Sequence, residues 1–174
     1  SYAAFRDCEE LTSVSLPEGL STIENRAFER CTQLKEIIIP DTVVCIQSNA
    51  FSFCKSLQKV KLPHMLMHID YDMFWECESL QEIDIPPHVK FIASNGFYKC
   101  TQLRRISLPE GLEEIGRYCF ANCENLTEIR LPSTVVHMDD SIFAHCEKLQ
   151  HITLPATLNY IPDSCFLGCS ELTD

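Results

Sequence analysis

The eleven cysteines are the side chains of this chain most capable of chemistry. Cysteine can form disulfide cross-links, bind zinc, or lie buried as an inert thiol that packs like a small apolar group. Three of the eleven, Cys45, Cys119 and Cys165, stand outside any regular series. The other eight recur with a constant step of 23 residues, at Cys8, Cys31, Cys54, Cys77, Cys100, Cys123, Cys146 and Cys169.

The spacing of the cysteines favours packing over chemistry. Zinc sites commonly pair two cysteines that are two to four residues apart. Cys119 with Cys123, and Cys165 with Cys169, come close to this spacing, but Cys119 and Cys165 fill a slot that suits a small apolar core residue. Equivalent cysteines of successive repeats are expected about 4.8 Å apart, which a disulfide can bridge. Parallel side chains in a packed core are typical of buried thiols, so we predict reduced structural cysteines and no metal site, with disulfides as the second interpretation.

The histidines do not predict a catalytic or metal site. His64 and His68 have the spacing of a metal pair only if they lie on a helix, and here they follow Pro63 in an expected loop. No Ser–His–Asp or Cys–His arrangement can be placed in one pocket, and uniform short loops form no deep cleft. We therefore expect no enzyme activity, no catalytic residue and no cofactor.

The 23-residue step organises the whole chain. Leucine, phenylalanine and proline recur in phase with cysteine, from Leu11 to Leu172, from Phe5 to Phe166 and from Pro17 to Pro155. A strict repeat of this length is typical of a solenoid, in which each unit packs only on its neighbours. The chain is therefore predicted to be one array over residues 1–174, with about seven full repeats and a partial repeat at each end, and to be a segment of a longer protein.

Each repeat predicts a strand, a loop and a helical turn. Val14 and Leu16 alternate with serines, as in a half-buried strand of three to five residues, and Pro17 ends it. The equivalent strands are expected to form one parallel sheet with right-handed connections. A short helical turn, α or 3-10, is predicted to carry Phe28 and Cys31. The predicted fold class is an α/β right-handed solenoid, with short parallel strands on the concave face and helical turns on the convex face.

The pattern Leu-x-x-Ile-x-Leu-Pro-x-x-Leu-x-x-Ile-x-x-x-Ala-Phe-x-x-Cys-x-x-Leu resembles the BspA-like leucine-rich repeat family, with the segment from Ala27 to Cys31 as its clearest match. The resemblance covers the whole chain and implies a leucine-rich-repeat solenoid without a catalytic motif. It also implies a bacterial or protozoan surface or secreted protein associated with adhesion. Asparagine is absent from its usual turn slot, so threonines such as Thr42 and Thr134, or water, are expected to satisfy the turn backbone.

Charge points to a binding surface on the strands. The net charge of −11 argues against nucleic acid or an acidic membrane as partner, and no apolar run is long enough to insert into a membrane. Exposed strand-face positions hold seven acids and six bases, so the acidity lies elsewhere. The predicted concave binding face comprises Glu36, Lys59, Lys61, Glu82, Asp84, Arg104, Arg105, Glu128, Arg130 and His151.

A second candidate surface lies on the expected convex side. Phe53, Trp75 and Tyr98 occupy neighbouring slots in three successive repeats, as an exposed interface or as padding of the ridge. The leading hypothesis is an adhesion module at the cell surface or secreted, which binds a host surface or matrix protein, or a glycan. The alternatives are a scaffold inside the cell or a structural spacer. End-to-end self-association is also expected.

Overall fold

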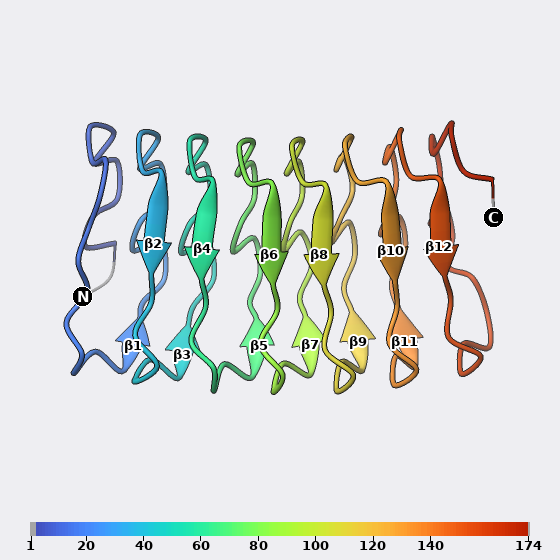
Figure 1. Ribbon diagram of the computed structural model, residues 1–174, viewed down its shortest axis with the longest axis horizontal. Coiled ribbons are helices and arrows are strands. Elements are labelled where there is room, and N and C mark those ends of the chain that lie inside the picture. The colour runs from blue at the N-terminus through green and yellow to red at the C-terminus, as the bar shows by residue number, and fades with distance from the viewer. Residues whose placement is uncertain (1–2, 174) are drawn as a thin grey trace.

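The computed structural model describes residues 3–173 and contains two parallel rows of strands. Figure 1 shows the coils side by side in a row from the N-terminus to the C-terminus. The row of three-residue strands comprises β2 (Glu36–Ile38), β4 (Lys59–Lys61), β6 (Glu82–Asp84), β8 (Arg105–Ser107), β10 (Glu128–Arg130) and β12 (His151–Thr153). The row of two-residue strands comprises β1 (Thr22–Ile23), β3 (Cys45–Ile46), β5 (His68–Ile69), β7 (Phe91–Ile92), β9 (Glu114–Ile115) and β11 (His137–Met138).

The longer strands confirm the predicted strand positions in six repeats. In five of them the middle residue is buried and its two neighbours are exposed, as the alternation requires. The strand predicted around Val14 and Leu16 is wrong, because residues 11–17 form no strand. The row of short strands was missed, because an isolated pair such as Thr22–Ile23 carries too little alternation to be recognised.

The prolines that recur every 23 residues form the corner between the two rows of strands. The carbonyl of each proline accepts a hydrogen bond from the N–H three residues later, as in Val43 to Pro40 and Val89 to Pro86 at 3.0 and 3.1 Å. Proline has no N–H to donate, so the longer strand ends there and the chain turns toward the short strand. The prolines thus set the length of every longer strand.

The stacked aromatic ladder forms the centre of the core. Successive ladder rings from Phe5 to Phe166 are nearly parallel, within 12°, with centroids 5.1–5.7 Å apart. The interior phenylalanines, with the ladder leucines, isoleucines and cysteines, belong to one continuous buried cluster. The large apolar side chains of the repeat therefore form the core, and the outward positions are left to the other side chains.

The predicted helical turns are wrong, because residues 3–173 contain no helix. An α-helix requires each N–H to donate to the carbonyl four residues earlier. Here Phe28 N–H instead donates to Ala50 O of the next coil at 2.8 Å, while Glu29 N–H donates to Arg26 O at 3.2 Å. Arg26 and Arg30 adopt left-handed φ values of 58° and 61°, which interrupt any helix. We call the stack of these segments the turn column, residues 3–8, 25–31, 48–54, 71–77, 94–100, 117–123, 140–146 and 163–169.

The longer strands join in couples instead of forming the expected single sheet. β2 pairs with β4, β6 with β8, and β10 with β12, all parallel and in register. The junctions between β4 and β6 and between β8 and β10 carry no ladder pairing. The residue that ends the proline turn alternates with the same two-repeat period, and valine marks the first member of each couple: Val43, Val89 and Val135. No helix among the described residues is long and apolar enough to cross a membrane.

Candidate functional site: the long-strand face

The long-strand face consists of the outward side chains of the three-residue strands and of the residues beside them. All ten side chains that the sequence predicts for the binding face are exposed here. Register places Glu36 opposite Lys59, Glu82 opposite Arg105, and Glu128 opposite His151. At the first residue of each longer strand, an acid on one strand therefore stands opposite a basic residue on its coupled partner.

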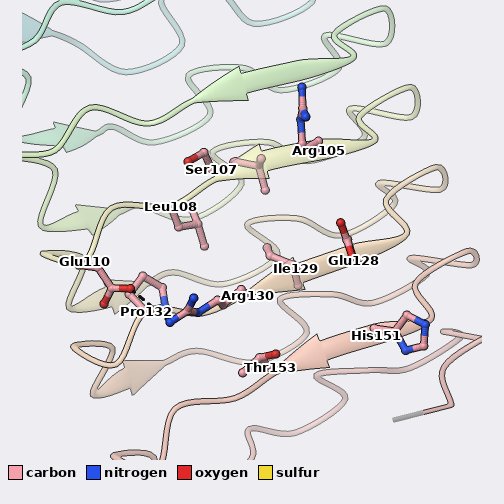
Figure 2. Close-up of a pocket in the computed structure, with 11 residues that line it drawn as sticks. Arg105, Ser107, Leu108, Glu110, Glu128, Ile129, Arg130, Pro132, His151 and Thr153 are labelled. Atoms are coloured by element: carbon pink, nitrogen blue, oxygen red, sulfur yellow. Dashed lines mark ion pairs between the residues drawn. The ribbon is translucent and has the colours of Figure 1, made fainter.

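Three open hollows cover most of this face. A hollow of about 450 Å³ spans β8, β10 and β12, and its floor includes Ile106, Leu108 and Ile129. Figure 2 shows Arg130 directed toward Glu110, with which it forms an ion pair at 3.7 Å. Arg105, Glu128 and His151 line the same hollow. Charged side chains thus surround an apolar floor.

A second hollow spans β2, β4 and β6, and so includes the uncoupled junction between β4 and β6. Its volume is about 630 Å³, and Val60, Leu62 and Ile85 form its apolar part. Lys61 and Asp84 stand at its sides. The two hollows therefore share one design three coils apart: each spans three successive longer strands, with apolar residues at its floor and charges of both signs at its sides.

A third hollow lies beside the N-terminal ends of β4, β6 and β8. It has a volume of about 560 Å³ and is lined only by long polar side chains: Gln58, Lys59, Gln81, Glu82, Arg104 and Arg105. Glu82 forms an ion pair with Arg105, which raises the pKa of the guanidinium. Nine of the ten predicted residues line one of the three hollows, and Glu36 lies outside them.

The bases of this face are less neutralised than those elsewhere. Among the described residues, Lys35, Lys59, Lys61 and Arg104 form no ion pair, and all four lie on the long-strand face. Away from this face, every described lysine and arginine has an acidic partner or, for Lys148, a hydrogen bond to Asn125. Among the described residues, Glu36, Asp84 and Glu128 of the same face also form no ion pair, so the unpaired charges of this face are of both signs.

Several residues of the face were not predicted as site residues. Ile38 is 62% exposed on β2 and borders the hollow that spans β2, β4 and β6. Its position between the inward Ile37 and Ile39 was a usable signal, because strand alternation places it outward. Gln58 and Gln81 also line a hollow, and their exposed slots resemble any solvated position in sequence.

The predicted aromatic patch is a real contact cluster on the turn column. Phe53 stacks on Trp75 with centroids 5.9 Å apart, and Trp75 meets Tyr98 edge-on at 5.5 Å. Tyr118, which was not predicted, extends the row at 6.4 Å from Tyr98. Arg30 lies over Phe53 at 5.3 Å. Because Phe53, Trp75 and Tyr98 are half-buried, these three rings pack against one another more than they present an open platform, whereas Tyr118 is exposed.

The ladder cysteines are packing residues with one specific polar contact. The seven ladder thiols from Cys31 to Cys169 each donate to the ladder phenylalanine carbonyl of the preceding coil, as in Cys54 to Phe28 and Cys77 to Phe51 at 3.1 and 3.2 Å. All eleven cysteines are free thiols, and burial raises the pKa of Cys31 to about 12. Within residues 3–173, no three His, Cys, Asp or Glu side chains are grouped to hold a metal ion.

Threonine takes the place of the missing turn asparagine. Thr42 donates to Leu20 O of the preceding coil at 2.8 Å, and Thr134 donates to Leu112 O at 2.6 Å. Thr157 does the same to Val135 O at 2.7 Å. This confirms that threonines satisfy the turn backbone in these three repeats.

Solved structures of bacterial leucine-rich repeat proteins share this architecture. The T. pallidum leucine-rich repeat protein is 30% identical with a TM-score of 0.83, covering 89% of this chain and 72% of its own. A leucine-rich repeat protein from Bacteroides ovatus is 21% identical with a TM-score of 0.69, over 97% of this chain. A leucine-rich cell surface protein from Faecalibacterium prausnitzii is 25% identical with a TM-score of 0.66, over 98% of this chain. The chain spans 61% of the length of each of the last two.

The sequence itself matches a known repeat family along its whole length. Among curated proteins there is no match. The family profile described as BspA type leucine-rich repeat region matches residues 1–104 and 90–174, with 6 copies of the repeat. The chain therefore belongs to the BspA-type leucine-rich repeat family.

Proposed function

We propose that the chain is a binding module that engages a protein at the long-strand face, and that it acts in adhesion at the cell surface or after secretion. The observation that carries the proposal is the set of three hollows, which nine of the ten predicted residues line. Proteins of this family are generally protein-binding, and one similar structure is described as a cell surface protein. Recognition of a partner, not catalysis, accounts for a wide face of mixed charge without a deep cleft.

The charge pattern argues for recognition by polar complementarity. Rim charges of both signs select partners and speed association more than they add affinity. The floors of the hollows are buried core residues such as Val60 and Ile106, so the area that a partner can bury comes from the side chains at the rims and from Ile38, which is 62% exposed. A glycan is the second candidate ligand, and an intracellular scaffold or a spacer is the second candidate role.

Charge reversal tests the face directly. A variant in which Lys59, Lys61, Arg104 and Arg105 are changed to glutamate is compared with wild type for capture of host matrix proteins and for attachment of coated beads to host cells. The matched control reverses four bases of other faces: Arg26, Lys90, Arg117 and Lys148. The proposal predicts loss of binding in the first variant and retention in the second. Equal binding by wild type and the first variant would contradict it, as would the absence of any binding by wild type.

A further inference from the structure

The row of short strands carries an exposed face of its own, and that face is acidic. We call it the short-strand face, and it comprises each short strand with the residue before it and the residue after it: residues 21–24, 44–47, 67–70, 90–93, 113–116, 136–139 and the equivalent segment 159–162. Apart from histidines, its charged residues are five acids and one base: Glu24, Asp70, Glu113, Glu114, Asp139 and Lys90. The long-strand face, in contrast, carries nearly equal numbers of acids and bases.

The base in this face and the base just beyond it are already neutralised. Two ion pairs at 2.8 and 3.0 Å account for them: Lys90 with Glu113, and Arg117 with Asp140. Within residues 3–173, Asp70 and Glu114 form no ion pair, and Asp139 pairs only with His137, whose Nε2 lies 3.0 Å from the carboxylate. The charge of this face that lacks a lysine or arginine partner is therefore of one sign, negative.

A hollow of about 230 Å³ opens in this face across β7, β9 and β11, which stand side by side in Figure 1. Ala93 and Gly116 line it, in the slot that holds Asp70 and Asp139 in the flanking coils. No side chain fits at Gly116, because a Cβ there would lie 2.5 Å from the backbone N of Ser94. The volume is below the roughly 300–1,000 Å³ of small-molecule pockets, so the hollow suits a single side chain.

Aromatic rings and carboxylates line this hollow together, and no lysine or arginine of the described chain does so. Phe91 is 40% exposed, and one face of its ring stacks on His68 with the centroids 4.8 Å apart. Strand register places Glu114 beside Phe91 in the next coil, on the side away from His68. The uncovered face of the Phe91 ring is therefore directed toward the coil of Glu114. Tyr71 and Asp139 also line the hollow.

The cation–π contacts within the chain show which group fits a ring beside a carboxylate. Three bases lie 5.3–5.9 Å from a ring centroid and also pair with an acid: Arg30 with Phe53 and Asp7, Lys99 with Tyr98 and Glu76, and Arg117 with Tyr118 and Asp140. The ring and the carboxylate both attract a cation, the first through its quadrupole and the second through its charge. Phe91 and Glu114 offer the same two groups without the base, so a base at this place must come from another molecule.

We propose that the hollow between β7 and β11 binds a lysine or arginine side chain from a basic segment of a partner protein. Glu114 and Asp139 supply the opposite charge, and Phe91 supplies the ring face. The surroundings of the hollow favour a protein over a free amine, because Met67 and Val136, on coils that line the hollow, are 48% and 57% exposed on the same face and can be covered by the rest of such a segment. This second binding surface does not depend on the long-strand face.

Peptide titration tests the sign of the ligand and the place of binding. Four peptides of equal length carry arginine, lysine, glutamine or glutamate at the same positions, and each is titrated into the isotope-labelled chain at physiological salt. The arginine and lysine peptides should bind at least about tenfold more tightly than the other two, with amide shifts at β7, β9 and β11. Failure of both basic peptides to bind, or shifts confined to another face, would overturn the proposal. Arginine amide that binds as tightly as the arginine peptide would overturn the choice of a protein partner.

Matched variants distinguish the hollow from general attraction to an acidic chain. Glu114→Gln with Asp139→Asn removes both carboxylates of the hollow and should weaken the arginine peptide at least about fivefold. Glu124→Gln with Glu147→Gln removes the same charge from exposed acids outside the hollow and should change the affinity less than about twofold. Equal losses in the two variants would mean that the peptide recognises net charge alone, and the site would be wrong.

A ring variant tests the aromatic contact separately. Phe91→Leu keeps an apolar side chain on the exposed side of β7 but removes the ring face, and it should weaken the arginine peptide about two- to fivefold. Unchanged affinity would contradict the part assigned to Phe91. These variants leave the long-strand face intact, so their failure leaves the proposed function standing, and the four-base reversal tests that function independently.

Discussion

The turn column and the long-strand face join the same coils in different ways. In the turn column, three backbone hydrogen bonds link each coil to the next at all seven junctions between described coils; at one junction the donors are Arg26, Phe28 and Arg30. On the long-strand face, ladder pairing links only alternate coils. Burial follows the same division, since the column holds the phenylalanine and cysteine ladders and the face holds exposed charge. The turn column therefore holds the stacked coils together, whereas the long-strand face presents exposed, charged side chains.

Alkaline pH should have the largest effect on the free energy of unfolding, because the thiols with the most strongly raised pKa values lie in the turn column. Burial raises the pKa of nine thiols of the turn column: that of Cys169 and, by larger amounts, those of the eight buried thiols Cys31, Cys54, Cys77, Cys100, Cys119, Cys123, Cys146 and Cys165. The folded state keeps these protons while the unfolded thiols ionise near pH 8.5, so their contribution is complete below that pH and falls above it. At about pH 9.5 the loss is about 1.4 kcal/mol per thiol and on the order of 10 kcal/mol in total. Urea unfolding at pH 7 and 9.5 under reducing conditions measures it.

A cysteine variant provides the control for this pH dependence. Cys77→Ala with Cys100→Ala removes two of the eight buried thiols, so its free energy of unfolding should fall less steeply with pH, by two protons. Identical slopes for the variant and wild type would show that the alkaline loss comes from other groups. Stability that does not change up to pH 9.5 would contradict the buried-thiol account.

The next largest loss of stability is expected from truncation of one phenylalanine of the aromatic ladder. Phe74 is fully buried and stacks between Phe51 and Phe97 at 5.5 and 5.3 Å. Phe74→Ala should lower the free energy of unfolding by about 3–5 kcal/mol, because a cavity opens in the middle of the stack. The matched control on the long-strand face is Ile38→Ala, which should change it by less than about 0.5 kcal/mol because Ile38 is exposed. Chemical denaturation measures both, and similar losses would break the comparison.

Backbone conformation gives a third and smaller contrast. Ser164 in the turn column is exposed and has a φ of 54°, where a β-branched side chain is strained. Ser164→Val should lower stability by about 1–2 kcal/mol, and Ser164→Gly should leave it unchanged or raise it by up to about 1 kcal/mol. Ser107→Val on β8 should have no such cost, since valine suits an extended strand. Thermal and urea unfolding of the three variants test the order, and a loss in Ser107→Val as large as that in Ser164→Val would refute it.

The smallest effect is expected for the ion pair of the long-strand face. Glu82 and Arg105 are paired across β6 and β8, yet both side chains are largely exposed. A double-mutant cycle with Glu82→Gln and Arg105→Gln should give a coupling energy below about 1 kcal/mol. A coupling energy above about 2 kcal/mol would mean that this face helps to hold the coils together, contrary to the division described above.

The ladders predicted most of the core and the position of the long-strand face. Phe28, Cys31 and their equivalents could be assigned to the interior because the strict 23-residue repeat places them in equivalent environments in every coil. The exposed sides of the longer strands followed from alternation, which held at β2 through β10. The predicted curvature and handedness stay predictions. The helical turns failed, because helical spacing of Ala27, Phe28 and Cys31 cannot reveal that Phe28 N–H donates to the next coil.

The amino-acid sequence by itself determined the period, the residues of the core and the slots that are exposed, because each of these depends on side-chain type at a repeated position. Tertiary structure alone decided where backbone hydrogen bonds go. It placed left-handed residues at two slots of each turn, formed short strands such as Thr22–Ile23, and coupled the longer strands two by two. These features depend on hydrogen-bond partners that lie a whole coil away. The sequence does not indicate which carbonyl will accept the hydrogen bond of a given backbone N–H. The hollows of the long-strand face, on which the proposed function depends, also arise from the tertiary structure.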